Sequence, residues 1–132
     1  MTLDDLAQEA ARLWRTLPPG GVVWLSGDIG AGKTTFVQAV TRAAGALPAR
    51  SPTYALVHTY ASPAGPIVHV DCYRLRHPEE ARDLDLARLR REARLLLIEW
   101  PERAGRHAPP PDAHLRLRHG ATPDARILET VG

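Results

Sequence analysis

The chain has 132 residues, of which 44% are hydrophobic and 24% charged, and its 17 basic and 15 acidic side chains leave a net charge of +2. These values fit one globular domain over residues 1–132 with its own core, and so small a charge excess gives no sign of nucleic-acid binding. The single cysteine, Cys72, excludes an internal disulfide, and no apolar run is long enough to span a membrane. Since the acidic N-terminus also lacks the apolar segment of a signal peptide, we expect a cytoplasmic protein.

The first predicted element is a helix. Thr2 and Asp5 have the spacing of a capping box, which would satisfy free N–H groups of a first helical turn. Apolar residues then recur at helical spacing, at Leu3, Leu6, Ala10, Leu13, Trp14 and Leu17. Prolines and glycines at 18–21 end this helix, and the apolar run at 22–25 predicts a strand buried on both faces.

Residues 33–44 predict a second helix, which follows a glycine-rich turn. Two runs rich in aromatic and β-branched residues, 54–60 and 66–70, predict strands. The segment 62–65 between them has the composition of a hairpin turn.

Pro78 suits the first position of a further helix, and the charged stretch from there to Ala93 carries leucines at helix-like spacing. Residues 94–99 predict a second buried strand. The segments 114–118 and 126–131 alternate apolar and polar residues and predict a terminal hairpin. The whole pattern indicates a three-layer α/β fold, with a mixed central sheet, helices on both sides and the hairpins toward the edges.

The most specific motif is Gly27-Asp28-Ile29-Gly30-Ala31-Gly32-Lys33-Thr34, which fits the phosphate-binding pattern G-x-x-x-x-G-K-[ST] without a mismatch. Glycines let backbone N–H groups face phosphate oxygens, and the next helix directs its positive end at the same anion. The Lys33 ammonium neutralises the phosphates, and the Thr34 hydroxyl is a ligand for Mg²⁺. With a strand before it and a helix after it, the motif predicts a P-loop NTPase-like fold that binds a nucleoside triphosphate.

Lys33 is also the only lysine among the 17 basic residues. In a chain that otherwise uses arginine, a retained lysine supports a site shaped around a compact ammonium. The absence of a second lysine removes the [NT]-K-x-D pattern by which guanine-specific switches read their base, so ATP is favoured over GTP.

Two acids stand at the ends of predicted strands, where a P-loop site needs a carboxylate near Mg²⁺. Glu99 ends the run 95–98 and Asp71 ends the run 67–70. Each carboxylate has a second interpretation, as the partner of one of the many arginines. Thr53 lies in a Ser-Pro-Thr loop whose hydroxyls either approach the γ-phosphate or cap a turn, and the residues alone favour neither role.

Three further residues have more ordinary interpretations. His69 and Asp71 share one face of a strand, but a His-x-Asp pair without further ligands is a poor zinc site. His58 and His69 are expected to face each other across the predicted hairpin. Trp100 is either a core residue or a neighbour of the nucleotide, and Cys72 is expected to be a small buried side chain.

Four segments in this order resemble one family: residues 27–36, then Ser51-Pro52-Thr53-Tyr54, then His69-Val70-Asp71-Cys72-Tyr73-Arg74-Leu75, then Glu99-Trp100-Pro101-Glu102. The chain is similar over nearly its whole length to the TsaE (YjeE) family. These are small bacterial ATPases needed to make threonylcarbamoyladenosine in tRNA. Residues 81–94 resemble the family less, because they are richer in arginine.

The resemblance implies a role for each matching position. Lys33, Thr53, Asp71 and Glu99 are implied to be catalytic, and Thr34 and Glu99 to hold Mg²⁺. Asp71 is a candidate for orienting the attacking water. The implied contacts with ATP are Gly27, Asp28, Ile29, Gly30, Ala31, Gly32, Lys33, Thr34, Thr35, Trp100, Thr2 and Arg126.

The resemblance also implies partners: a TsaB–TsaD-type transferase complex, with tRNA reached only through that complex and no membrane. ATP hydrolysis would reset the complex between turnovers, and we expect it to be slow without the partners. The main alternative is a small P-loop kinase for a nucleoside or other small molecule, in which the arginine-rich stretch 82–94 would be the phosphate-covering lid. A direct nucleic-acid binder rests on arginine content alone, which the 15 acids nearly cancel.

Overall fold

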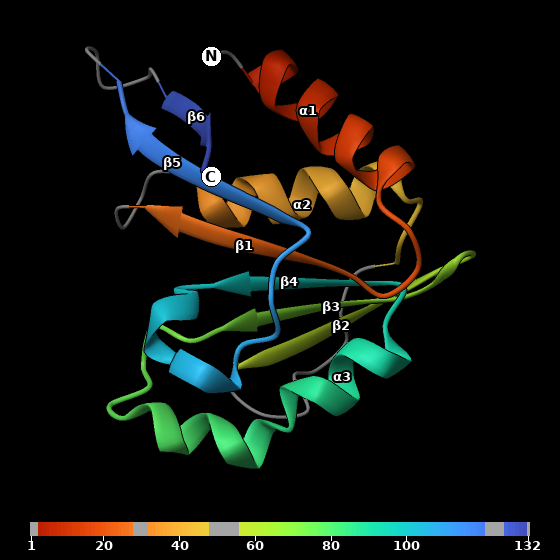
Figure 1. Ribbon diagram of the computed structural model, residues 1–132. Helices are drawn as coiled ribbons and strands as arrows, with labels where there is room; N and C mark the ends of the chain where they lie inside the picture. The colour runs from red at the N-terminus through yellow and green to blue at the C-terminus, as the bar shows by residue number, and fades with distance from the viewer. Residues whose placement is uncertain (1–2, 28–31, 48–55, 121–125, 132) are drawn as a thin grey trace.

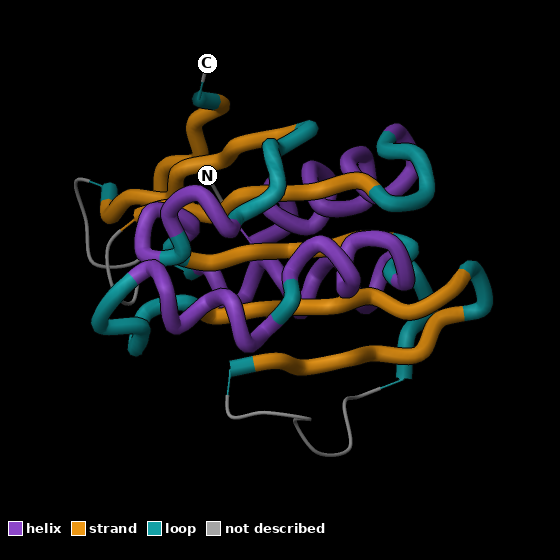
Figure 2. Tube along the Cα trace, turned by 60° about the horizontal axis from the view of Figure 1, so that its bottom comes forward, coloured by secondary structure: helices purple, strands orange, loops and turns teal. Residues whose placement is uncertain are grey.

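Six strands form one sheet in the order β2-β3-β4-β1-β5-β6, with helices on both faces (Figure 1, Figure 2). The computed structural model describes residues 3–27, 32–47, 56–120 and 126–131, apart from the side chains of Leu3, Asp4 and Arg126. The strands are β1 (Gly21–Gly27), β2 (Val57–Ser62), β3 (Gly65–Asp71), β4 (Leu95–Glu99), β5 (Ala113–His119) and β6 (Arg126–Thr130).

The four inner strands, β3, β4, β1 and β5, run parallel, and each edge strand is antiparallel to its neighbour. β4 is buried at every position, which explains why its sequence is an apolar run and not an alternating one. The mixed sheet and both predicted hairpins, β2–β3 and β5–β6, are confirmed.

One face of the sheet is covered by α1 (Leu3–Thr16) and α2 (Lys33–Ala43), which pack against each other. The helical spacing of their apolar residues places one stripe of each helix on the sheet. Buried side chains of these two helices include Leu6, Ala10, Leu13, Phe36, Val37 and Val40. Full burial of one such large side chain stabilises the fold by about 1.5–3 kcal/mol.

The other face is covered by four shorter elements: η1 (Pro78–Leu84), α3 (Leu86–Glu92), η2 (Pro101–Arg103) and η3 (Gly105–His107). The continuous helix predicted from Pro78 to Ala93 is therefore wrong. Asp85 takes a left-handed conformation with φ 49°, and its side chain accepts a hydrogen bond from the backbone N–H of Arg88. Asp tolerates this conformation better than most residues, so it ends η1 and caps the start of α3.

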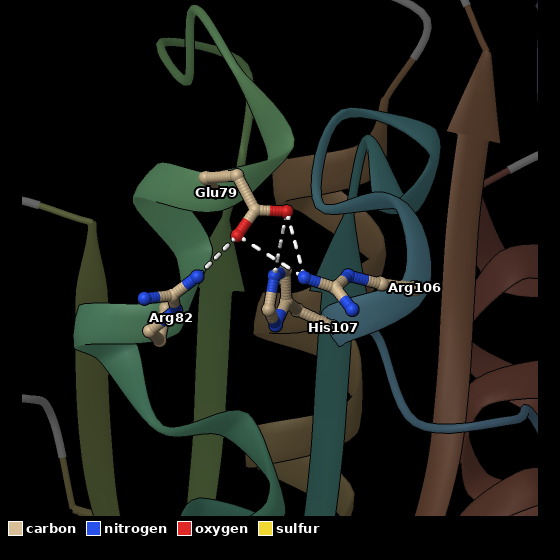
Figure 3. A network of polar contacts seen from close by, with 4 residues as sticks. All are labelled: Glu79, Arg82, Arg106 and His107. Atoms are coloured by element: carbon tan, nitrogen blue, oxygen red, sulfur yellow. Dashed lines mark hydrogen bonds and ion pairs between the residues drawn. The ribbon is translucent and has the colours of Figure 1, made fainter.

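η1 is tied to η3 by a cluster of charged side chains around Glu79 (Figure 3). The Glu79 carboxylate accepts hydrogen bonds from Arg82 at 2.7 Å and from Arg106 at 3.1 Å, and His107 lies 3.5 Å away. Arg82, followed by Arg106, lowers the pKa of Glu79 from 4.5 to about 2. Arg82 of the arginine-rich stretch is thus paired with an acid that lies just before that stretch.

Within the described residues, no helix has both the length and the apolar character needed to cross a lipid bilayer.

Candidate functional site

The parallel strands β1, β3 and β4 have their carboxyl ends at the same edge of the sheet, which runs across the strands and not along β2 or β6. Asp71 and Glu99 are directly paired in the β3–β4 register, and β1 lies on the other side of β4. Two backbone hydrogen bonds fix this edge, from Cys72 N–H to the Glu99 carbonyl at 3.0 Å and from Trp100 N–H to the Leu25 carbonyl at 3.1 Å. Glu99 therefore lies between Asp71 on β3 and Leu25 on β1.

A pocket of about 320 Å³ opens at this edge. Its described lining comes from the start of α2 and from the ends of β3 and β4. The residues are Gly32, Lys33, Thr34, Thr35, Asp71, Tyr73, Glu99 and Trp100. Seven of the residues predicted for the site, drawn from segments almost 70 positions apart, thus share one pocket with Tyr73.

Lys33 is buried at 6% exposure, although a lysine is rarely buried without partners. Its ammonium donates a hydrogen bond to the Gly27 carbonyl at 2.6 Å, and it lies 4.8 Å from the centre of the Trp100 ring. These contacts hold the only lysine of the chain at the start of α2, beside the pocket.

The N-terminus of α2 adds positive potential at the same place. Gly32 occupies the N-cap position with φ 106°, and it has no side chain to accept from the N–H groups of the first turn. Those N–H groups and the helix dipole favour an anion. Lys33 and this helix end together suit phosphate.

Gly27 allows β1 and β5 to approach closely where the turn begins. Its φ is 132°, and a Cβ atom there would lie 1.9 Å from the Leu117 carbonyl oxygen. Ser26, one residue earlier, is bonded to β5 as well, because its hydroxyl lies 2.8 Å from His114 Nε2. Burial is the main cause that lowers the pKa of His114, and Arg116 contributes. Neither the close approach at Gly27 nor the contact of Ser26 with His114 could be predicted from the sequence.

Trp100 also has an unusual backbone, with φ 55°. This left-handed turn comes directly after β4, and the Trp100 ring lies near both Lys33 and Tyr73, with ring centres 5.1 Å apart for the aromatic pair. The Arg103 guanidinium lies over both rings, at 5.0 Å from Tyr73 and 5.4 Å from Trp100. Trp100 therefore lies at the pocket, and Tyr73 and Arg103 are neighbours that sequence analysis did not single out.

His69 and Glu99 form a short polar contact at the site, which the sequence did not predict. His69 Nε2 lies 2.5 Å from Glu99 Oε2, and both residues are buried. His58 faces His69 across the β2–β3 pair as expected, with the rings stacked at 5.8 Å. Cys72 is fully buried, which confirms that expectation too.

Several predicted site residues cannot be placed. Thr2, Asp28, Ile29, Gly30, Ala31 and Thr53 lie outside the described residues. Arg126 begins β6 opposite His119, at the same edge of the sheet as the pocket, but its side chain is outside the described part. Among the described residues, no group of three or more His, Cys, Asp or Glu side chains is arranged to hold a metal.

The fold and this edge of the sheet define a class of protein: a three-layer α/β protein of the P-loop type, with the G-K-T turn between a central strand and the next helix. The family model described as "Threonylcarbamoyl adenosine biosynthesis protein TsaE" matches residues 1–127, so the chain belongs to the TsaE family of tRNA threonylcarbamoyladenosine biosynthesis. The resemblance found in the sequence is thus confirmed.

Individual relatives agree with this assignment. The chain is 37% identical to the TsaE protein of Rickettsia bellii, over 78% of this chain and 72% of the relative. It is 39% identical to that of Aquifex aeolicus, over 74% and 68%, and 34% identical to that of Haemophilus influenzae, over 83% and 69%. In fold it is similar to the crystal structure of YdiB from Bacillus subtilis, with a TM-score of 0.78 at 22% identity, over 98% of this chain and 80% of that one.

Proposed function

We propose that this protein binds ATP with Mg²⁺ at the pocket between α2, β3 and β4 and hydrolyses it in support of tRNA threonylcarbamoylation. The observation that carries the proposal is the convergence of Lys33, Thr34, Asp71 and Glu99 on one pocket. A buried ammonium, a hydroxyl and two carboxylates are the groups that a P-loop site uses.

The phosphate end of the nucleotide would lie against Lys33 and the first turn of α2. Lys33 would exchange its bond to the Gly27 carbonyl for phosphate oxygens, which carry a full negative charge and accept more strongly. The segment 28–31 would contribute backbone N–H groups, as the motif predicts.

The donor set also fits Mg²⁺, which prefers oxygen ligands and usually takes only one or two from the protein. The Thr34 hydroxyl and the Glu99 carboxylate would hold the ion beside the phosphates, where it would neutralise charge that develops during phosphoryl transfer. Asp71 would accept a hydrogen bond from the attacking water and orient it. One Asp71 oxygen already accepts from the Tyr73 N–H at 3.0 Å, which limits rotation of the carboxylate.

The kinase alternative receives no support from the arginine-rich segment. Its leucines Leu84 and Leu86 are buried against the sheet, as expected for a packed helix. None of the described residues lining the pocket is an arginine. Transfer to water remains the proposed reaction, and the lack of an arginine in this described lining supports slow turnover by the chain alone.

The partners follow from the family resemblance: a TsaB–TsaD-type complex, through which tRNA is reached indirectly. The exposed Tyr73, which lies beside Trp100 and under the Arg103 guanidinium, offers a surface at the pocket where such a partner would sense the nucleotide.

ATP turnover with and without candidate TsaB and TsaD proteins tests the proposal. We expect Mg²⁺-dependent phosphate release that rises when both partners are present. Glu99→Ala should lower it by roughly 100-fold or more, about 3 kcal/mol of transition-state stabilisation. Full activity of the isolated chain would refute the partner dependence, and an unaffected rate in Glu99→Ala would refute the ligand assignment. Phosphate transfer to a small acceptor in preference to water would establish a kinase instead.

A further inference from the structure

A buried histidine, His69, has no role in the function proposed above. It lies in β3 two residues before Asp71, and its exposure is 6%, against 4% for Glu99. His69 Nε2 lies 2.5 Å from Glu99 Oε2 on the neighbouring strand. A side chain that the reaction does not touch is therefore bonded to a carboxylate that the reaction needs.

The pairing has a physical reason. A buried carboxylate is costly unless hydrogen bonds replace the lost water, and Asp71 lies beside Glu99 in the β3–β4 register. An ionised carboxylate can only accept, so His69 Nε2 carries the hydrogen of this bond. The bond compensates Glu99 for burial and fixes one of its two oxygens.

The His69 ring is itself held in place. His58 lies opposite it in β2, with the two ring planes 25° apart and their centres separated by 5.8 Å. Ile67, on the same strand and the same face as His69, is buried in the core under α1 and α2. Because the His69 ring cannot turn freely, its hydrogen bond restricts the orientation of the Glu99 carboxylate.

We propose that His69 is a positioning residue: it binds Oε2 of Glu99 and leaves the other oxygen for the cation. This inference rests on the function proposed above. Groups that orient a metal ligand typically change metal affinity by about 10- to 100-fold when removed. The structure thus assigns to His69 an effect on the cation, with little effect on the nucleotide alone.

Three variants separate positioning from a merely structural role. His69→Leu removes the donor at similar volume, and His69→Gln restores an N–H donor near the position of Nε2. Val68→Ala is the matched control, because it weakens packing in the same strand but on the opposite face of the sheet. Circular dichroism and urea unfolding verify that each variant folds.

The readout is binding without turnover. Mn²⁺ replaces Mg²⁺, and the electron paramagnetic resonance signal of unbound Mn²⁺ is followed in the presence of ADP. The affinity for ADP without metal is measured separately in EDTA. We expect His69→Leu to weaken Mn²⁺ binding by about 10- to 100-fold and to change the affinity for ADP without metal by no more than about twofold. We expect His69→Gln to recover most of the lost Mn²⁺ binding. Unchanged Mn²⁺ binding in His69→Leu would overturn the role of His69 alone. The role of His69 would also be overturned if His69→Leu lost as much affinity for ADP without metal as for Mn²⁺, or if His69→Gln did not recover Mn²⁺ binding. Absence of ADP-dependent Mn²⁺ binding in the unmodified chain would overturn the proposed function itself.

Discussion

Replacing Gly27 with alanine tests why the end of β1 requires glycine beside β5. Gly27 pairs with Leu117 at the end of β1, its φ is 132°, and an added Cβ would lie 1.9 Å from the Leu117 carbonyl oxygen and 2.9 Å from its carbonyl carbon. A carbon–oxygen contact needs about 3.3 Å, so the two strands would have to separate by about 1 Å or more. Gly27→Ala therefore combines backbone strain with a steric clash.

The expected loss of unfolding free energy is the sum of these two costs. A non-glycine residue at positive φ costs about 1–2 kcal/mol, and overpacking against rigid neighbours adds about 1–3 kcal/mol. Gly45→Ala is the matched control, because Gly45 has φ 67° and nothing within 4 Å of its added Cβ. We expect about 2–5 kcal/mol for Gly27→Ala and about 1–2 kcal/mol for the control.

Urea unfolding followed by tryptophan fluorescence and by far-UV circular dichroism measures the difference. A loss of about 3 kcal/mol moves the midpoint by roughly 1–2 M urea. If the two variants unfold within about 0.5 kcal/mol of each other, the close approach of β1 and β5 is not what requires glycine at position 27, and the reasoning fails.

Two further predictions concern titratable groups. Burial, with smaller contributions from Asp71, Glu102 and Glu99, raises the pKa of the Cys72 thiol to about 12. A thiol reagent at pH 8 should therefore react slowly with the folded chain and rapidly with the chain unfolded in urea. Fast reaction of the folded chain would contradict the burial of Cys72. Since the pKa of Glu79 is lowered from 4.5 to about 2, its ion pairs contribute stability that is present above pH 4.5 and is lost as the pH falls toward 2. Glu79→Gln should make the free energy of unfolding in urea depend less on pH between 4.5 and 2. The effect should be slight, because the ion pairs are exposed and screened by salt. The exposed control Asp83→Asn should leave this pH dependence unchanged.

Most of the fold could be predicted because the signals for it are local. Apolar runs gave the buried strands, helical spacing gave α1 and α2, and glycine and proline marked the turns. The break at Asp85 could not be predicted, because a charged stretch with leucines at helical spacing continues on both sides of it. One residue in a left-handed conformation leaves no trace in the periodicity.

In the candidate site too, features that depend on one strand could be predicted, and features that depend on the pairing of strands could not. The positions of Asp71 and Glu99 at strand ends followed from each strand separately. Their direct pairing, and the contact of His69 with Glu99, depend on the register between two strands whose paired residues, such as Asp71 and Glu99, are 28 positions apart. Sequence patterns within each strand carry no information on that register. The roles of Thr2, Thr53 and Arg126 stay predictions, since the described structure does not include their side chains.

The left-handed backbone at Trp100 has a consequence for the evolution of this corner. Glycine would remove a strain of about 1–2 kcal/mol at that position, yet it would also delete the ring beside Lys33 and Tyr73. Relief of backbone strain alone would favour glycine, so the tryptophan marks a place where an easy backbone conflicts with core packing and with the make-up of the pocket. A redesign that idealised the backbone here would relieve the strain and remove an aromatic side chain from the pocket lining.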